Sequence, residues 1–225
     1  SANRVDYFIA NSQHTAARIW RCYRRHAEVI YPPVDIDRFS VSEKKADFYL
    51  TVSRLVSYKK VALIIKAFNQ LGRPLVAIGT GPELNQLQQI AGDNVQLLGP
   101  QPNAVVSKYM AQAKAFIYAA CEDFGIALVE AQACGTPVIA YGAGGALETV
   151  RDIREHPDTG TGLLFEAQTE QSLVEAIKAF EKYEPRFNRE ILRSHAESFG
   201  PKIFQERYLA FVDRSYQKFK AGDRI

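Results

Sequence analysis

The sequence lacks several features that would set it apart from an ordinary globular domain. Its three cysteines, Cys22, Cys121 and Cys134, have no metal-ligand spacing and leave one thiol over in any disulfide scheme. We therefore expect reduced thiols and no metal site. No apolar run approaches the ~18 residues that cross a bilayer. The net charge of +3 gives no sign of a nucleic-acid partner, so the sequence predicts a soluble, cytoplasmic protein.

One local excess of charge lies near the N-terminus. Arg18, Arg21, Arg24 and Arg25 fall mostly at helical spacing. Such a row is typical of a solvated helix face, and it also suits a surface that meets anionic lipid or an anionic acceptor. Both interpretations stay open. The second would place the protein in peripheral contact with the inner face of the membrane.

Short β-branched or aromatic runs alternate with segments of helical period. Strands of a main domain are expected over 48–53, 74–79, 95–99, 115–120, 137–142 and 162–166. Helices are expected over 61–71, 82–91, 103–113, 126–134, 146–150 and 169–183. Few polar positions interrupt the strands, which predicts a parallel sheet covered on both faces. The fold class is therefore α/β, a doubly wound, Rossmann-like sheet.

Three parts are expected along the chain. Residues 1–45 predict a strand, a helix and a linker, residues 46–184 the Rossmann-like domain, and residues 185–225 two further helices. One face of the last helix carries Phe204, Tyr208, Phe211, Ser215 and Phe219. Since such a stripe is usually buried, we expect it to pack on the N-terminal segment or on a domain outside this chain.

The strongest motif is "CEDFGIALVEAQACGTPVIAYGAGG", residues 121–145. Glu122 lies just after an expected strand, at the sheet edge where doubly wound proteins bind ligands. Gly125 permits a sharp turn, and a helix starts near Ile126 with free N–H groups and a positive dipole end. A diphosphate suits those amides, whereas Glu122 and Glu130 would repel it. Carboxylates bind hydroxyl groups well, so the motif predicts a nucleotide sugar; the alternative is a helix-capping Glu122 and a solvated Glu130.

The same residues carry a family resemblance. "EDFGIALVEAQACGTPVIA" resembles the E-x7-E signature of retaining glycosyltransferases of family 4 with the GT-B fold, and "GAGGALETV" and "SRLVSYKK" resemble further segments of that family, in order. The resemblance runs from about residue 5 to residue 180 and makes this chain the C-terminal, donor-binding half. It implies that Glu130 holds the donor ribose and that Glu122 contacts the transferred sugar. The amides implied to meet the diphosphate and sugar are those of Phe124, Gly125, Ile126 and Ala127.

Cations are expected in the loop after the first strand of the main domain. Arg54 and Lys59, with Lys60 in reserve, can neutralise a diphosphate and stabilise it as a leaving group. The resemblance implies that role for the arginine and for one of the two lysines, and we favour Lys59. Taken alone, a Lys-Lys pair at a helix start is more often solvated.

Three further loops carry weaker signals. Gly79 and Gly81 form a poor dinucleotide fingerprint but a reasonable turn for a nucleotide at the sheet edge. Gln101 follows the third strand of the main domain, where the resemblance implies a backbone contact with the base. Gly145 belongs to another close-approach loop, in which Glu148 is a candidate helix cap.

The resemblance implies transfer of a hexose from a nucleoside diphosphate to an acceptor hydroxyl with retained configuration, without cofactor or metal. GDP-mannose is the favoured donor, because "RIWRCYRRHAEVIYPPVDIDRF" looks like mannosyltransferases of surface-polysaccharide assembly; a UDP-sugar is the alternative. The implied partners are an acceptor glycan or glycolipid and an N-terminal GT-B domain that this chain, as an inactive fragment, lacks. Competing hypotheses are a non-catalytic nucleotide-sugar sensor, a GT-B epimerase and an NAD-dependent oxidoreductase, the last without its expected glycines.

Overall fold

The computed structural model describes residues 4–222 and contains a six-stranded sheet in the order β5-β4-β3-β6-β7-β8. The strands are β3 (Tyr49–Val52), β4 (Leu75–Ile78), β5 (Val95–Gly99), β6 (Ala115–Tyr118), β7 (Val138–Tyr141) and β8 (Gly162–Phe165). Every neighbouring pair is parallel. The chain winds outward from β3 in one direction and then returns to β6 and winds in the other. The doubly wound, Rossmann-like prediction is confirmed.

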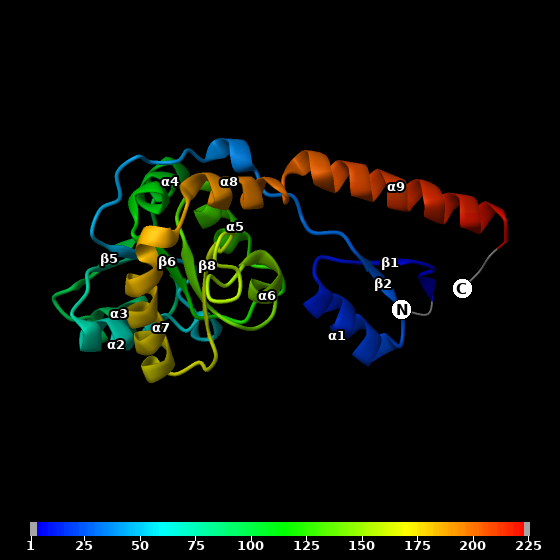
Figure 1. The fold of residues 1–225 in the computed structure, drawn as a ribbon. Coiled ribbons are helices and arrows are strands. Elements are labelled where there is room, and N and C mark those ends of the chain that lie inside the picture. The colour runs from blue at the N-terminus through cyan, green and yellow to red at the C-terminus, as the bar shows by residue number, and fades with distance from the viewer. Residues whose placement is uncertain (1–3, 223–225) are drawn as a thin grey trace.

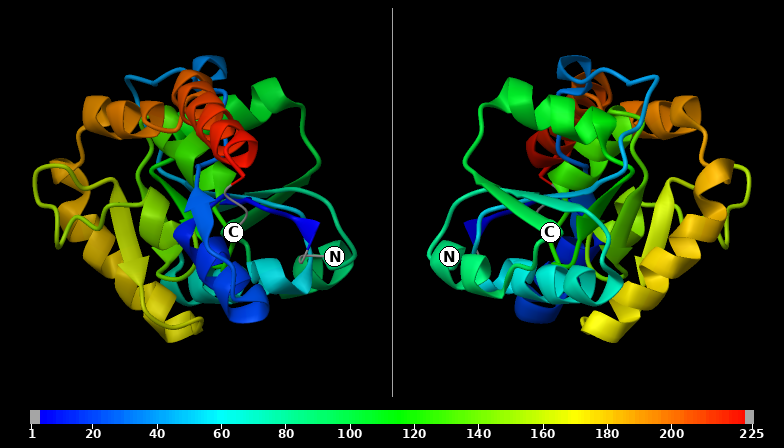
Figure 2. Two further views of the ribbon diagram at one scale, coloured as in Figure 1. Left: turned by 90° about the vertical axis from the view of Figure 1, so that its right-hand side faces the viewer. Right: turned by 90° about the vertical axis from the view of Figure 1, so that its left-hand side faces the viewer.

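Helices cover both faces of this sheet (Figures 1 and 2). They are α2 (Val61–Leu71), α3 (Leu84–Ile90), α4 (Asn103–Gln112), α5 (Ile126–Ala133), α6 (Ala146–Thr149) and α7 (Glu170–Tyr183). Successive residues of a strand point to opposite faces. Phe116 and Tyr118 accordingly pack in the core under α4 and α5, and Ile117 packs in the core under α2 and α7. Apolar side chains on both faces explain why these strands read as near-continuous hydrophobic runs.

The N-terminal segment forms a small parallel unit of its own. Strand β1 (Phe8–Ala10) leads into α1 (Gln13–Tyr23) and pairs with β2 (Ala27–Val29). The Ser12 hydroxyl accepts from the amide of Thr15 and starts the helix. The sequence predicted the first strand and the helix, but not the pairing of the extended stretch after them.

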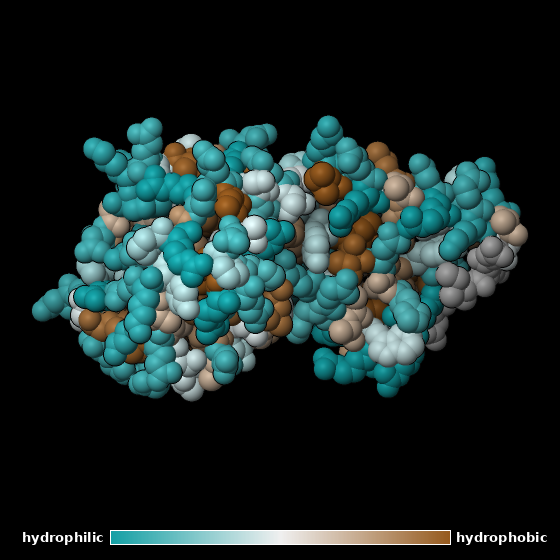
Figure 3. All heavy atoms as spheres, viewed as in Figure 1, coloured by the Kyte–Doolittle hydropathy of each residue, from teal (hydrophilic) through white to brown (hydrophobic). Residues whose placement is uncertain are grey.

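The C-terminal helices differ in their packing. Helix α8 (Arg189–Glu197) lies against α5, whereas α9 (Pro201–Lys220) extends away from the sheet toward the β1–α1–β2 unit (Figure 1). Phe211 meets Tyr7 edge-on at 6.5 Å between ring centroids. No residue of α9 is buried, and hydrophobic surface lies along it in Figure 3. The aromatic stripe therefore meets the N-terminal segment in part, as expected, but its side chains are half-buried or exposed rather than buried within residues 4–222.

The arginine row of α1 is partly used inside the chain. Arg18 pairs with Asp123 at 2.7 Å, and Arg25 donates to the main-chain oxygen of Asp6 at 2.8 Å. The row is thus not only a solvated face, because Arg18 connects α1 to the loop that carries Glu122. Within residues 4–222, no helix combines the length and apolar character that crossing a membrane requires.

Candidate functional site

The candidate site lies where the strand order reverses, at the carboxyl ends of β3 and β6. Crevices at this point bind ligands in doubly wound sheets because the two following loops leave in opposite directions. Ser53 and Arg54 follow β3, and Glu122 follows β6. The fold therefore brings the two strongest sequence motifs to one edge of the sheet.

Two adjoining cavities open at this edge. The larger, about 720 Å³, is lined by Glu130 and by the predicted residues Arg54, Gly79, Gly81 and Gln101, among others. The smaller, about 410 Å³, is lined by Lys59, Glu122 and the predicted run Phe124, Gly125, Ile126 and Ala127. Val52, Ser53 and Ala127 line both cavities. One elongated ligand can therefore extend through both, with Glu130 beside it in the larger cavity and Glu122 in the smaller.

The start of α5 forms the wall between the two cavities. Gly125 has φ 87 and ψ 58, a left-handed conformation that costs glycine little. The amide of Leu128 donates to the Gly125 oxygen at 2.9 Å. The amides of Ile126 and Ala127 precede it in the first turn, where a helix offers no internal acceptor. This arrangement suits an anion such as a diphosphate.

Lys59 and Glu122 form an ion pair in the smaller cavity. The Lys59 ammonium lies 2.5 Å from Glu122 Oε1 and donates to the Tyr118 hydroxyl at 2.8 Å. Burial opposes the charge on Lys59, but its bonds to Glu122 and Tyr118 outweigh this effect and raise the pKa of Lys59. The ammonium therefore stays charged, and it lines the same cavity as Ile126 at the start of α5.

Glu130 is paired with a residue that the sequence did not single out. Arg38 Nη2 lies 2.8 Å from Glu130 Oε1. Burial raises the pKa of Glu130, and the charge and hydrogen bond of Arg38 act against that rise. Arg38 comes from the linker before the sheet and lies 92 residues away in sequence, so no local pattern could have indicated this pair.

The cations of the predicted phosphate loop separate in space. Arg54 is exposed and lines the larger cavity. Neither site acid pairs with it, because Glu122 pairs with Lys59 and Glu130 with Arg38. Lys60 has a left-handed backbone, φ 57, and lines a different pocket beside Cys121 and Gln168. Of the two lysines, only Lys59 therefore lines the cavities, as the sequence-based preference for it requires.

Gly79 and Gly81 allow two loops at the carboxyl ends of the strands to pack closely against each other. A Cβ on Gly79 would lie 1.9 Å from the Ser53 oxygen, and one on Gly81 would lie 2.2 Å from the Leu55 oxygen. Their absent side chains let the loop after β4 pack on the loop after β3. The Gln101 side chain donates to the Leu98 oxygen at 2.8 Å and so fixes its own loop.

Gly145 is not among the residues that line the two cavities. Its amide donates to the Glu122 oxygen at 2.8 Å, and a Cβ there would lie 2.3 Å from Phe124 Cα. Gly145 therefore supports the loop of Glu122 from behind. Glu148 does cap a helix, namely α1, since its carboxylate accepts from the amides of Gln13 at 2.7 Å and His14 at 3.1 Å.

Ser53 is a second residue that the sequence analysis passed over. Its hydroxyl is buried on the wall shared by both cavities, and within residues 4–222 no hydrogen-bond partner is found for it. A buried hydroxyl without a partner is costly, so a ligand oxygen is its natural complement. Its place directly before Arg54, at the end of a strand, was a usable signal.

The charges of the site suit an organic anion with hydroxyl groups. The cations Arg38, Arg54 and Lys59 and the acids Glu122 and Glu130 line the two cavities, with Arg38 paired to Glu130 and Lys59 to Glu122. In the part of the chain that is described, no three His, Cys, Asp or Glu side chains are grouped to hold a metal ion. The thiols of Cys22, Cys121 and Cys134 are all free.

Comparison with known proteins shows which family the chain resembles. A family model described as "Glycosyl transferases group 1" matches residues 34–199. The D-inositol 3-phosphate glycosyltransferase of Mycobacteroides abscessus is 27% identical, over 99% of this chain and 55% of its own length. A GDP-mannose-dependent monoacylated alpha-(1-6)-phosphatidylinositol monomannoside mannosyltransferase of Corynebacterium glutamicum is 33% identical, over 77% of this chain and 52% of its own length.

A solved structure extends the similarity to the fold. The crystal structure of Anabaena Alr3699/HepE in complex with UDP and glucose superposes with a TM-score of 0.81 at 23% identity, and the match covers 95% of this chain and 65% of that one. The chain spans about half the length of the curated relatives it matches. With the family model covering most of the sheet and the site, the chain belongs to the glycosyl transferases group 1 family.

Proposed function

We propose that this chain is the donor-binding half of a retaining GT-B glycosyltransferase of family 4. Residues 46–184 form the nucleotide-sugar domain, residues 1–45 derive from the acceptor half, and residues 185–225 return toward it; of these, 1–3 and 223–225 lie outside the described residues. The observation that carries the proposal is the pair of adjoining cavities, which have one acid each and meet at the start of α5.

The donor lies along the two cavities in this proposal. The nucleoside occupies the larger one, where the carboxylate of Glu130 accepts from the ribose hydroxyls. The diphosphate lies at the junction, near the amides of Ile126 and Ala127 and in reach of Arg54. The sugar enters the smaller cavity beside Glu122. This order places each charged group against a partner of opposite charge or a hydrogen-bond donor.

The reaction moves a hexose to an acceptor hydroxyl on the face that the diphosphate leaves. Arg54, Lys59 and the start of α5 stabilise the negative charge that develops on the departing diphosphate. A phosphate oxygen takes the acceptor proton on the same face, which retains the anomeric configuration. Since the chain spans about half of its relatives, the acceptor, a glycan or glycolipid, is held mainly by the other half. The isolated chain should bind nucleotide weakly and transfer nothing.

Two donors are compared in the test. The printed name of the Corynebacterium relative specifies GDP-mannose, and the Anabaena structure contains UDP. GDP-mannose is the favoured donor, with a UDP-sugar as the alternative. Calorimetric titration of the chain with GDP, UDP, ADP and their sugar conjugates should give binding for one base and none for the others. Absence of binding by all of them would contradict the proposal.

The two acids should respond differently in the same titration. Glu130→Ala should weaken binding of the free nucleoside diphosphate by about 10-fold or more, because bonds to a charged group are lost. Glu122→Ala should change that affinity by less than about 2-fold, since its partner is the sugar, and should weaken only the sugar conjugate. The reverse order would overturn the assignment of the two acids.

A further inference from the structure

Arg38 stands out because it reaches the donor cavity from outside the sheet. It ends the short helical turn Ile36–Arg38 of the linker and lines the larger cavity. Its guanidinium lies 4.7 Å from the centre of the Phe39 ring and donates to Glu130 Oε1 at 2.8 Å. The side chain of Glu130 is 20% exposed and that of Arg38 is 42% exposed, so the bond is formed at the cavity wall rather than in open solvent.

The turn that carries Arg38 is fixed to the helix that carries Glu130. Arg193 of α8 donates through Nη1 to the main-chain oxygens of Ile36 at 3.0 Å and of Ala133 at 3.1 Å. Ala133 ends α5, three residues after Glu130. One guanidinium therefore joins the linker turn to the end of α5 and holds the backbones that carry Arg38 and Glu130 near each other.

We propose that Arg38 is a positioning residue for donor binding: it fixes the Glu130 carboxylate so that Oε2 and the remaining lone pair of Oε1 meet the ribose hydroxyls. The inference rests on the proposed function, since it assumes a nucleotide in the larger cavity. A carboxylate has about four acceptor sites, and Arg38 uses one. Holding the acid in one orientation before the ligand arrives lowers the entropic cost of binding.

Arg38 also governs the charge of Glu130. The charged and titratable groups around this carboxyl are Arg38 from the linker, Cys134 directly after α5, and Arg54 from the loop after β3, which lines the same cavity. Burial raises the pKa of Glu130 and Arg38 counteracts it. Without Arg38 the carboxyl protonates at a higher pH, and a protonated acid accepts hydrogen bonds less strongly. Loss of Arg38 should therefore weaken binding more at pH 5.5 than at pH 7.5.

The test uses three arginine variants and two kinds of ligand. Arg38→Gln removes the charge, Arg38→Lys keeps it, and Arg73→Gln removes an arginine from an ion pair at the opposite edge of the sheet as a matched control. Each variant is titrated calorimetrically with GDP and UDP and with their 2′,3′-dideoxy analogues, at both pH values. Circular dichroism of each variant shows whether it is folded.

We expect Arg38→Gln to lower the affinity for the ribonucleotide by about 10-fold at pH 7.5, and further at pH 5.5. Arg38→Lys should recover most of the loss, and Arg73→Gln should behave as the wild type. The dideoxy analogue and the Glu130→Gln background should each abolish the effect of Arg38→Gln, because Arg38 acts through the acid on the ribose.

Other outcomes would overturn the inference. Tighter binding by Arg38→Gln would make Arg38 a competitor of the ribose. An equal loss with the dideoxy analogue would make it a direct phosphate or base contact. Wild-type affinity at both pH values would mean no role in binding. All three require that the wild-type chain binds GDP or UDP; if it binds neither, the proposed function fails instead.

Discussion

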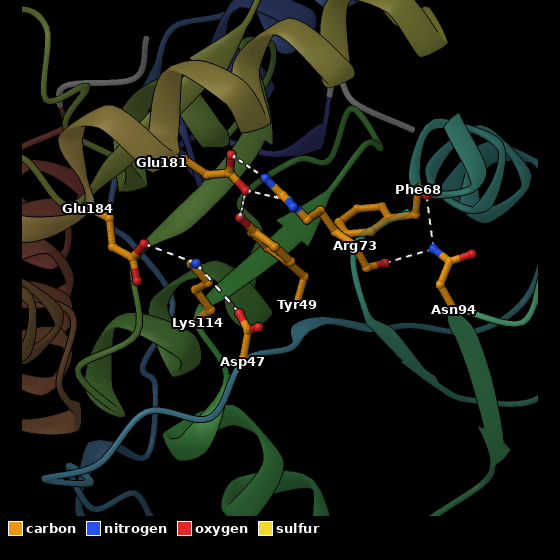
Figure 4. Close-up of polar contacts among 8 residues, drawn as sticks. All are labelled: Asp47, Tyr49, Phe68, Arg73, Asn94, Lys114, Glu181 and Glu184. Carbon is orange, nitrogen blue, oxygen red and sulfur yellow. Dashed lines mark hydrogen bonds and ion pairs between the residues drawn. The ribbon is translucent and has the colours of Figure 1, made fainter. Parts of the chain in front are cut away.

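The two edges of the central sheet use charge in opposite ways. At the amino ends of the strands, charged groups satisfy one another (Figure 4). Glu181 accepts from Arg73 Nε at 2.8 Å and lies 3.3 Å from the Tyr49 hydroxyl. Lys114 pairs with Glu184 at 3.2 Å and with Asp47 at 3.6 Å. These contacts tie the end of α7 to the starts of β3, β4 and β6.

At the carboxyl ends, the charged groups are arranged around empty volume. Lys59 and Glu122 pair beside one cavity, Arg38 and Glu130 pair beside the other, and Arg54 stands at the wall with neither acid as its partner. The difference follows from polarity: the starts of helices, with their unsatisfied N–H groups, meet at this edge. The charges at the amino ends tie elements of the sheet together, whereas those at the carboxyl ends line two cavities, where we propose that the donor binds.

The largest expected effect is at the carboxyl edge. Gly145→Ala puts a Cβ 2.3 Å from the Phe124 backbone, so the loop of Glu122 must shift. We expect a loss of about 3 kcal/mol in the free energy of unfolding by urea and loss of nucleotide binding. Gly142→Ala is the control, because its Cβ has ordinary contacts of 3.4 and 3.5 Å and should cost about 0.5 kcal/mol. Equal effects of the two changes would show that the close approach is unimportant.

Adjacent lysines give a sharper test of the same edge. Lys59→Met should weaken binding of the nucleoside diphosphate sugar by about 10- to 100-fold, because a charge-assisted contact is lost. Lys60→Met should change it by less than about 2-fold, since Lys60 lines a different pocket. Isothermal titration of both variants measures the difference. A larger loss at Lys60 would exchange the roles of the two residues.

The stability of the protein should depend on pH through His195 of α8, which packs near the candidate site. His195 of α8 contacts the Thr149 oxygen at 3.2 Å, and burial, with Arg151 nearby, lowers the pKa of His195 to about 4. In the unfolded chain, His195 takes up a proton below its ordinary pKa of about 6.5, whereas in the folded protein it does so only near pH 4. The free energy of unfolding is therefore highest above pH 6.5 and decreases as the pH falls from 6.5 toward 4. This group alone should lower the free energy of unfolding by about 2 kcal/mol between pH 7.5 and pH 5.

Urea unfolding of the wild type and of His195→Gln at both pH values isolates that contribution. The glutamine cannot take up the proton, so its variant should lose about 2 kcal/mol less over the same interval. An identical loss in both proteins would mean that His195 is not the group responsible.

The smallest effect is expected at the amino edge. Tyr49 is buried, and burial, with Glu181 adding to it, raises the pKa of Tyr49. Tyr49→Phe removes only the hydroxyl bond to Glu181, which should cost about 1 kcal/mol of unfolding free energy. Nucleotide affinity should stay at the wild-type value. A loss of affinity as large as that of Lys59→Met would contradict the conclusion that only the carboxyl ends of the strands take part in nucleotide binding.

Most of the sheet was predictable because its strands are buried on both faces. Ile117 and Phe116 point to different cores, so the run "AFIYAA" contains no polar position and stands out against the amphipathic helices around it. The positions of Glu122 and Glu130 beside the cavities could be predicted for a related reason: Glu122 follows β6 and Glu130 lies in α5, the next helix, at the carboxyl ends of the strands. Sequence order and strand polarity together fix their place.

The remaining contacts depend on tertiary packing that no local pattern encodes. Arg38 meets Glu130 across 92 residues, and Glu148 caps α1 across 135 residues. The aromatic face of α9 meets the N-terminal segment at Tyr7 but is not buried, because periodicity indicates a face that favours burial and not how far a partner covers it. The close-approach loop of Gly145 was predicted, but its partner, the loop of Glu122 and Phe124, is given by the tertiary structure alone.

A crystal structure of the chain with GDP-mannose or a UDP-sugar tests the central claim most directly. The account predicts the ribose against Glu130, the diphosphate at the start of α5 and the sugar beside Glu122. A well-ordered nucleotide bound elsewhere, with both cavities at the carboxyl edge left empty, would contradict it.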